Sequence, residues 1–186
     1  QQNFEASVLA CLELNGEDIP EGATHGIVLD RTCFYPEGGG QEGDYGNLRC
    51  DSASHYILDT RKVGDLVLHL STGSFEVGDM VHGELDWSRR RQLMDHHTAV
   101  HIVGGAARRL LGPHIYQAGA NKSVESARLD ITHHKRLTRA ELDAIESLAN
   151  EVIHSVARTE KITLDRKDAD RKYGFDLYQG GAPKGS

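Results

Sequence analysis

Residues 77–111 read VGDMVHGELDWSRRRQLMDHHTAVHIVGGAARRLL, and the sequence pattern changes from β-strand to helix within this stretch. Val77–Asp86 has the turn residues and short apolar runs of the last hairpin of a small barrel. Ser88 is a residue type that caps helices, and Gly112-Pro113 is a helix stop, so a helix is predicted up to Leu111. Its expected core stripe consists of Leu93, Val100, Val103, Ala107, Leu110 and Leu111.

The segment before this stretch favours β structure throughout. Turn residues such as Asn15-Gly16 separate short apolar runs at residues 7–10, 26–29, 55–58 and 66–70. Regular short strands with glycine-rich turns are typical of a small barrel or sandwich. We therefore expect a β-barrel domain over residues 1–87.

The segment after the first helix mixes strands and helices. Ile115 to Ile131 predicts strands around a turn at Gly119. Thr138 and Glu141 have the spacing of a capping box, which opens a second long helix to about Arg158. The inward residues expected on that helix are Leu142, Ile145, Leu148, Val152 and Ile153.

The last part of the chain predicts a strand near Ile162–Leu164, a short helix near Arg166–Lys172 and a loop over residues 179–186. The chain starts without a methionine and ends in that loop, so we expect an excised fragment. The fold class predicted is α+β, with the small barrel followed by an α/β domain over residues 88–186. In that second domain two long helices lie on a sheet.

Composition excludes several classes of protein. The net charge of −7 argues against bulk attraction to nucleic acid, although a local basic patch can still hold one RNA end. No run approaches the roughly 20 apolar residues that cross a bilayer, and no signal segment opens the chain. The three cysteines, Cys11, Cys33 and Cys50, are an odd and scattered set, which favours a reducing cytosol.

Two histidines on the predicted helix offer metal-binding chemistry. His97 and His101 are four residues apart, so their side chains lie one above the other on one helix face. Neutral imidazoles placed in this way are half of a tetrahedral zinc site. His96 points about 100° away on the same helix and is not an expected ligand. No glutamate follows His97, so the metalloprotease arrangement His-Glu-x-x-His is absent.

Two further motifs are polar or glycine-rich. Residues 30–41, DRTCFYPEGGGQ, contain the triplet Gly38-Gly39-Gly40, whose amides can face a phosphate or a ribose. The same triplet is also compatible with a tight loop at a barrel end. Gln117 follows the first helix, and its side-chain amide can both donate and accept hydrogen bonds to a small polar ligand.

In this order and spacing the motifs resemble one family, the editing region of alanyl-tRNA synthetases. Free-standing alanyl-tRNA editing proteins share this region. The resemblance runs from about Phe4 to Ser186, and the two ends of the chain are most similar to the archaeal synthetases. The segments that carry it are Thr32 with Phe34–Gln41, Asp86–Arg90, His97–His101, Gln117–Gly119 and Ala127–Asp130. The sequence departs from the family at Val100, where many members have threonine.

The resemblance implies a translation-factor-like barrel, an editing domain and hydrolysis of seryl- or glycyl-tRNA(Ala). One pocket separates alanine poorly from glycine and serine, so a second, hydrolytic site is needed. His97, His101 and Gln117 are the implied catalytic residues. The implied contacts to the tRNA acceptor end are Thr32, Gly38, Gly39, Gly40, Gln41, Arg89, Arg90 and Arg91.

The resemblance also implies a zinc ion. Its ligands in this chain are His97 and His101, and in the family a later Cys-x-x-x-His segment supplies the others. No cysteine follows Cys50, so the remaining ligands are expected beyond Ser186, and the fragment's own site is expected to be incomplete. The fragment is expected to be a cytoplasmic monomer, and the parent synthetase a dimer through a later segment.

Two other functions remain open. The chain can be an RNA-docking module whose histidines are structural, which would bind tRNA without hydrolysing seryl-tRNA. It can also be a metal hydrolase for an unrelated substrate, with a complete site that recruits His133, His134 or His154. The neighbouring Lys135-Arg136 and the position of His154 on the second helix favour surface or packed histidines there.

Overall fold

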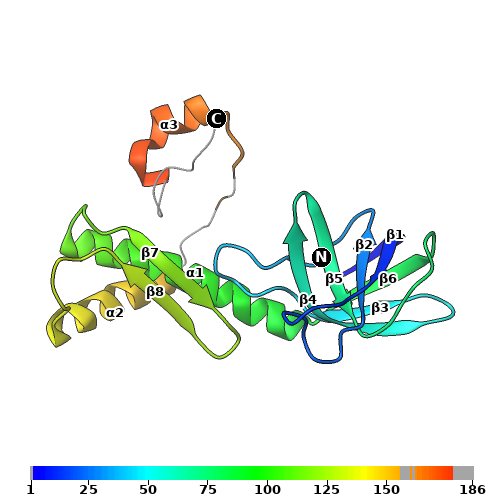
Figure 1. The fold of residues 1–186 in the computed structure, drawn as a ribbon. Helices are drawn as coiled ribbons and strands as arrows, with labels where there is room; N and C mark the ends of the chain where they lie inside the picture. The colour runs from blue at the N-terminus through cyan, green and yellow to red at the C-terminus, as the bar shows by residue number, and fades with distance from the viewer. Residues whose placement is uncertain (1, 156–159, 161, 178–186) are drawn as a thin grey trace. The chain divides into compact units, whose positions relative to one another are not determined.

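The computed structural model describes residues 2–155, 160 and 162–177. It is a mixed α+β structure with a closed six-stranded barrel, a two-stranded sheet and three α-helices (Figure 1). The chain divides into two compact units. The first comprises residues 1–95 and 122–126, and the second comprises residues 96–121 and 127–186.

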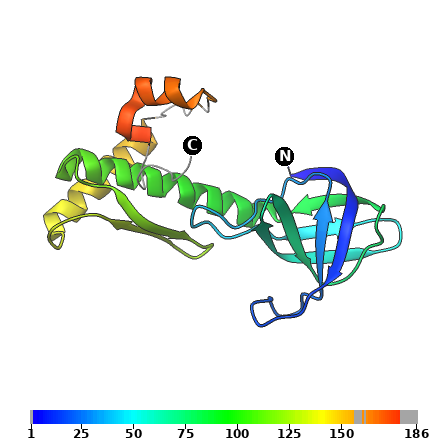
Figure 2. The same ribbon diagram turned by 45° about the horizontal axis from the view of Figure 1, so that its top comes forward.

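The six strands form a closed barrel (Figure 2). The barrel is antiparallel and has the strand order β1-β2-β5-β4-β3-β6. Pairing of β1 with β6 closes it, so no strand of the barrel is left with a free edge. The strands are β1 (Asn3–Glu13), β2 (His25–Leu29), β3 (Gly46–Arg49), β4 (Ser54–Val63), β5 (Leu66–Ser71) and β6 (Met80–Leu85). The prediction of a small β-barrel in the first half of the chain is confirmed.

Alternate residues of these strands point inward and form the barrel core. On β1, Phe4, Ala6 and Val8 are buried, while the residues between them are more exposed. Each large apolar side chain removed from water contributes about 1.5–3 kcal/mol. The core cluster comprises Phe4, Ala6, Val8, Ile27, Leu29, Phe34, Leu48, Ile57, Phe75, Val81 and Leu85.

Two details of the barrel differ from prediction. Residues 77–86 are not a hairpin: Gly78 has a φ of 98° in a turn, and only Met80–Leu85 forms a strand. The strand β3 was not anticipated, because only Leu48 of its four residues is a large apolar residue. Tight packing explains its first residue, since a Cβ on Gly46 would overlap the backbone of β6.

The helix α1 (Trp87–Leu111) begins next to the barrel's last strand. Its first turn is capped by Asp86, whose Oδ1 accepts the amide N–H of Arg89 at 3.0 Å. The prediction that Ser88 caps the helix is therefore wrong by two residues. Aspartate caps a helix as well as serine does, and Asp86 is the residue placed to accept a free amide N–H of the first turn. At the other end Gly112 leaves the helical conformation with a φ of 120°, as the predicted helix stop requires.

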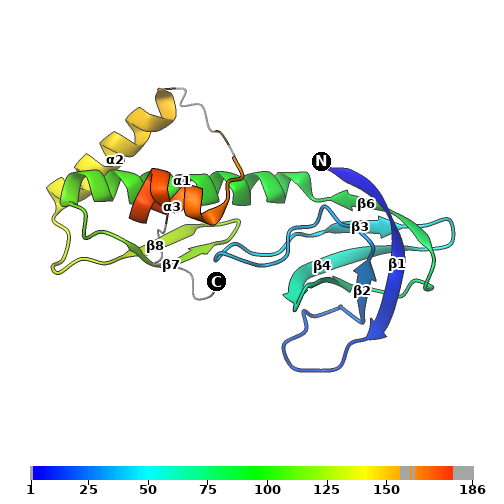
Figure 3. The same cartoon turned by 90° about the horizontal axis from the view of Figure 1, so that it is seen from above.

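In the second unit, two helices and a hairpin share a core. The strands β7 (Gln117–Lys122) and β8 (Ala127–Ile131) form the two-stranded sheet, and α2 is Arg139–His154 (Figure 3). Buried Ala106 and Ala107 of α1 join Ile145 and Ala149 of α2. The remaining core members are Ile102, Leu111, Ile115, Ile131, Leu137 and Leu148.

The capping box of α2 is present as predicted. The Thr138 side chain accepts the amide N–H of Glu141 at 3.3 Å, and the Glu141 carboxylate accepts that of Thr138 at 2.8 Å. The helix ends at His154 with Ser155 as its C-cap, so it is shorter than predicted, and residues 156–159 lie outside the described part.

Other sequence predictions for the second half need correction. Gly119 lies inside β7, and the hairpin turn is at Ser123–Ser126, where Ser123 N–H bonds the Ser126 carbonyl at 2.9 Å. The strand predicted at Ile162–Leu164 is wrong, since these residues have no regular structure. The short helix is confirmed as α3 (Arg166–Tyr173), followed by a 3-10 turn, η1 (Gly174–Leu177), and the predicted loop at 179–186 lies outside the described residues.

No helix in the described ranges combines the length and apolar character needed to cross a bilayer. The three cysteines are free, half-buried thiols.

Candidate functional site

The histidine pair lies in the middle of α1, as predicted. The rings of His97 and His101 have centroids 5.0 Å apart and an interplanar angle of 31°. His97 is half-buried and His101 is exposed, so a ligand from solvent can reach the pair. Two imidazoles one helical turn apart fit two positions of a tetrahedral zinc. Among the described residues, no third histidine, cysteine or carboxylate joins them into a three-ligand group.

Val100 lies on the buried face of α1, with only 5% of its surface exposed. It is therefore part of the packing beneath the histidine pair. Leu93, one helical turn before His97, is fully buried on the same side. The apolar stripe predicted for α1 is thus correct at Leu93, Val100 and Ala107, whereas Val103 and Leu110 are exposed.

Gln117 is the first residue of β7, and the backbone before it is firmly held. The Tyr116 N–H donates to Thr132 Oγ1 at 2.8 Å, and Thr132 N–H donates to the Tyr116 carbonyl at 2.9 Å. The Arg108 guanidinium lies 4.7 Å from the Tyr116 ring centroid. Gln117 itself is half-buried. Its side-chain amide is therefore partly accessible, on a backbone whose position is fixed by the bonds of the preceding residue.

Two of the motif segments are brought together in the small sheet. Gly119 on β7 faces Asp130 on β8 so closely that a Cβ on the glycine would lie 2.8 Å from Asp130 Oδ2. Arg128 pairs with the same carboxylate at 3.3 Å. Gly119 therefore lies within a strand, not in a turn, and a side chain there would crowd the Asp130 carboxylate on the neighbouring strand.

The glycine-rich loop is held by a buried lysine that sequence reasoning missed. Lys122, 1% exposed, donates from Nζ to the Gly39 carbonyl at 2.7 Å and from its backbone N–H to the Gly40 carbonyl at 2.6 Å. Burial lowers the pKa of Lys122. Gly39 and Gly40 have φ angles of 59° and 75°, a region that favours glycine. No signal in the sequence marks a buried lysine at the end of a short polar strand.

Gln41 is buried and forms an isolated parallel bridge with Lys122. Gly38 forms an antiparallel bridge with Gln41, and the Tyr35 hydroxyl donates to the Gly38 carbonyl at 3.0 Å. The loop is therefore held by bonds between its own residues.

Thr32 connects this loop to the barrel interior. Its Oγ1 accepts the Phe34 N–H at 3.0 Å and lies 2.8 Å from Nε2 of His69. The His69 ring is fully buried, and its Nδ1 lies 2.9 Å from the Ile27 carbonyl. A carbonyl can only accept, so Nδ1 carries the proton and Nε2 accepts from Thr32. Burial lowers the pKa of His69 to about 4, against the opposing effect of the Ile27 bond.

The three arginines at the start of α1 have different environments. Arg89 pairs with Glu42 at 2.8 Å and stacks over the Tyr45 ring at 3.8 Å. Burial would lower the pKa of Arg89, but bonds to Glu42 and Tyr45 outweigh it and raise the pKa. Through these contacts the first turn of α1 binds Glu42 and Tyr45, which follow the glycine-rich motif in sequence.

Arg90 forms a bidentate pair with Asp44, which is 1% exposed, and donates from Nη2 to the Cys33 carbonyl at 2.8 Å. Arg91 has a side chain that is 65% exposed and pairs with Asp95 one turn later at 3.1 Å. Phosphate contact by the three arginines stays a prediction, and Arg91 has the exposed side chain that such contact needs.

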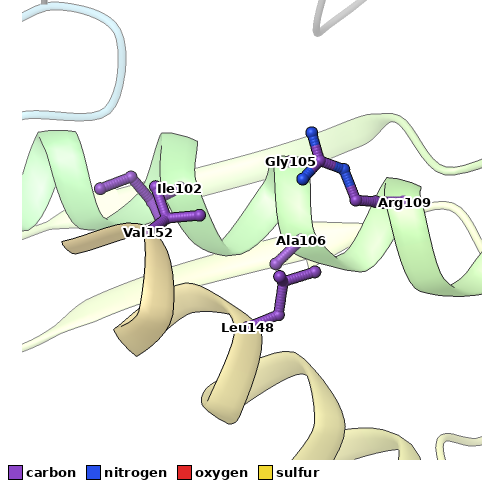
Figure 4. Close-up of a pocket in the computed structure, with 6 residues that line it drawn as sticks. All are labelled: Ile102, Gly105, Ala106, Arg109, Leu148 and Val152. Atoms are coloured by element: carbon purple, nitrogen blue, oxygen red, sulfur yellow. The ribbon is translucent and has the colours of Figure 1, made fainter. Parts of the chain in front are cut away.

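A cavity of ≈ 210 Å³ lies between α1 and α2 (Figure 4). It is mostly apolar, with Arg109 as its charged residue, and sequence reasoning did not anticipate it. The residues lining it are Ile102, Gly105, Ala106, Arg109, Leu148 and Val152.

Comparison with known proteins places these motifs in a family. The sequence model of one protein family, described as tRNA synthetases class II (A), matches residues 2–89. The alanine–tRNA ligase of Haloquadratum walsbyi is 46% identical over 182 residues, which is 98% of this chain. Those of Metallosphaera sedula and Halobacterium salinarum are 50% and 47% identical over 84% and 98% of the chain.

This chain is a homologue of a segment of alanine–tRNA ligase. These three relatives are archaeal. The matched part is only 19%, 18% and 19% of the length of the Haloquadratum, Metallosphaera and Halobacterium ligases. The similarity to alanine–tRNA ligase extends over both compact units, because the Haloquadratum match covers 98% of this chain.

Proposed function

We propose that this chain is the editing region of a cytoplasmic alanine–tRNA ligase and takes part in hydrolysing seryl- or glycyl-tRNA(Ala). The observation that carries the proposal is the His97–His101 pair on α1, in a chain homologous to alanine–tRNA ligase. Alanine differs from its two competitors by one methyl or one hydroxyl group. Such small differences give limited discrimination in one pocket, so a ligase benefits from a second, hydrolytic site.

His97 and His101 would hold a zinc ion through their ring nitrogens, with the remaining ligands supplied from beyond Ser186. When bound, zinc would supply positive charge that orders the aminoacyl end or polarises a bound oxygen. The donor set fits this role in part, because imidazoles one turn apart need no backbone movement to share an ion.

The reaction is hydrolysis of the ester between the amino acid and the terminal ribose. A water oxygen bonds to the carbonyl carbon, the bond from that carbon to the ribose oxygen breaks, and a proton passes to the ribose oxygen. An aminoacyl ester is already reactive, so fixed positions of ester and water can supply much of the rate. Gln117 would orient the ester or the amino group, because its side-chain amide can both donate and accept hydrogen bonds. The bond between Tyr116 and Thr132 fixes the backbone from which this side chain extends.

The glycine-rich loop would approach the tRNA acceptor end. Gly38 to Gly40 carry no side chains, so a sugar or phosphate can come close to their backbone. Lys122 already holds two of the loop's carbonyls, which presents the loop in one conformation. Arg91 would add a phosphate contact from an exposed position.

Substitution of neighbouring histidines tests the proposal. His97→Ala, in the chain extended beyond Ser186, is expected to reduce seryl-tRNA(Ala) deacylation by at least about 100-fold, as loss of a positioning group does. His96→Ala on the same turn serves as the matched control and should keep most of the activity. Equal activity and equal zinc content in His97→Ala and the unsubstituted protein would refute the assignment.

A further inference from the structure

Three histidines from two separate segments meet in the second unit. His114 lies in the turn after α1, and His133 with His134 follows β8. Each ring offers one nitrogen within 4.8 Å of those of the other two. Within residues 2–155, 160 and 162–177, this is the one group of three such ligands. His154, on α2, is not a member and instead lies 2.8 Å from the Asn150 carbonyl through Nδ1.

The ring geometry is close to that of a metal site. His114 Nε2 lies 2.9 Å from His133 Nδ1, and these two rings are nearly parallel, at 20°. The His134 ring centroid lies 4.6 Å from that of His133 and 5.7 Å from that of His114. Two nitrogens bound to one tetrahedral zinc are about 3.3 Å apart, so a small outward shift of the His114 and His133 rings would admit the ion between them. The nitrogen of His134 lies within 4.8 Å of both.

Hydrogen bonds of Thr132 hold the two segments together without help from the rings. Thr132 Oγ1 donates to the His114 carbonyl at 2.7 Å, beside the Thr132–Tyr116 backbone bond. Gly112 leaves room for the His114 ring, since a Cβ there would lie 3.1 Å from its Nδ1. The three donors are therefore brought to one place before any ligand arrives, which lowers the cost of binding.

The local charges also permit a cation. Lys135, next to the cluster, pairs with Glu141 at 3.0 Å, so its charge is offset. His133 Nε2 is buried and has no hydrogen-bond partner in the described part of the chain. The nitrogen of this ring that faces His114 is Nδ1, so Nδ1 is the donor that His133 would offer to the ion.

We propose that His114, His133 and His134 bind a divalent ion of the zinc class through three imidazoles, with a fourth position open to water. Imidazole donors suit zinc, nickel and copper rather than magnesium or calcium. The ion would fasten the segment after α1 to the segment after β8. The site is separate from the His97–His101 pair, and its existence does not depend on the editing function.

Zinc titration by calorimetry tests this site in the His97→Ala/His101→Ala variant, which lacks the other histidine pair. We expect one zinc per chain. Changes outside the ligand set already weaken metal binding by about 10–100-fold, so adding His133→Ala should weaken it by at least about 100-fold. His154→Ala in the same background is the matched control and should bind as tightly as the double variant.

Nitrogen NMR of the imidazole rings in the unsubstituted protein gives a second readout that needs no variant of the cluster. Zinc should shift the ring signals of His114, His133 and His134 together, at one equivalent. Absence of zinc binding in the double variant, unchanged affinity after His133→Ala in a folded protein, or zinc-insensitive ring signals would each overturn the proposal.

Discussion

At the scale of single residues, His69 connects the barrel core to the glycine-rich motif. Its ring donates to the Ile27 carbonyl and accepts from Thr32, whose oxygen also accepts the Phe34 amide. Thr32 therefore has a structural partner inside the protein, in addition to the tRNA contact expected from the sequence. A buried neutral histidine in this chain of bonds makes the barrel sensitive to acid.

The pH dependence of stability follows from the pKa of His69. The folded pKa is about 4, below the ordinary value of 6.5, so the unfolded state binds more protons between these pH values. Stability from this residue is complete above pH 6.5 and is lost as the pH falls towards 4, by on the order of 3 kcal/mol. Denaturant unfolding at several pH values should show a flatter profile for His69→Gln than for His154→Gln. Equal slopes in the two variants would contradict this account.

The glycine triplet can be tested with two neighbouring substitutions. Gly40 has a φ of 75°, so Gly40→Ala should lower the free energy of unfolding by about 1–2 kcal/mol. Gly38→Ala is the control, because its Cβ would meet Tyr35 Oη at 3.5 Å and the Pro36 carbonyl at 3.6 Å, which are ordinary contacts. Its expected effect is within about 0.5 kcal/mol. Similar losses in thermal or denaturant unfolding of both variants would show that the loop's backbone conformation is not the cause.

At the scale of elements, the first turn of α1 is fastened to the loop that follows the glycine-rich motif. Arg89 and Arg90 reach back to Glu42 and Asp44, and Lys122 holds the other side of the loop. The basic run 89–91 indicated cations on a helix face, but the sequence did not show which partners they take. The acidic partners of Arg89 and Arg90 lie more than 40 residues earlier, so only the folded chain brings them together.

Two adjacent arginines, Arg90 and Arg91, allow the stability contribution of a buried ion pair to be compared with that of an exposed one. Arg90→Met leaves the buried Asp44 carboxylate unpaired and should destabilise the protein by about 3–5 kcal/mol. Arg91→Met removes only the exposed pair with Asp95 and should cost less than about 0.5 kcal/mol. Urea unfolding measures both variants. A loss in Arg91→Met as large as that in Arg90→Met would contradict this distinction between the two ion pairs.

Helices were easier to predict than short strands. The capping box at Thr138 and the stop at Gly112 act locally, so the sequence alone located the ends that they define. Gly119 was placed in a turn, whereas its contact with Asp130 comes from cross-strand packing. Ile162–Leu164 has strand-forming residues but no regular structure, because local propensity does not decide the structure of so short a segment.

At the scale of the whole chain, the expected residues fall into both compact units. Thr32, residues 38–41 and residues 89–91 belong to the first unit, and His97, His101 and Gln117 belong to the second. The expected boundary at residue 87 coincides with the start of α1, whereas the compact units divide inside that helix, after Asp95. Spacing on one helix made the His97–His101 pair predictable. Lys122 and the histidine cluster at 114, 133 and 134 needed the tertiary structure, because their partners are distant in sequence.

Deacylation of seryl-tRNA(Ala), with and without added zinc, is the measurement that tests the proposed editing function. It compares this chain with a chain extended beyond Ser186, and alanyl-tRNA(Ala) serves as the control substrate. We expect zinc-dependent hydrolysis of the seryl ester by the extended chain, little hydrolysis by this chain alone, and no hydrolysis of the alanyl ester by either. Hydrolysis by neither chain, with tRNA still bound, would contradict the editing function and favour an RNA-docking module with structural histidines.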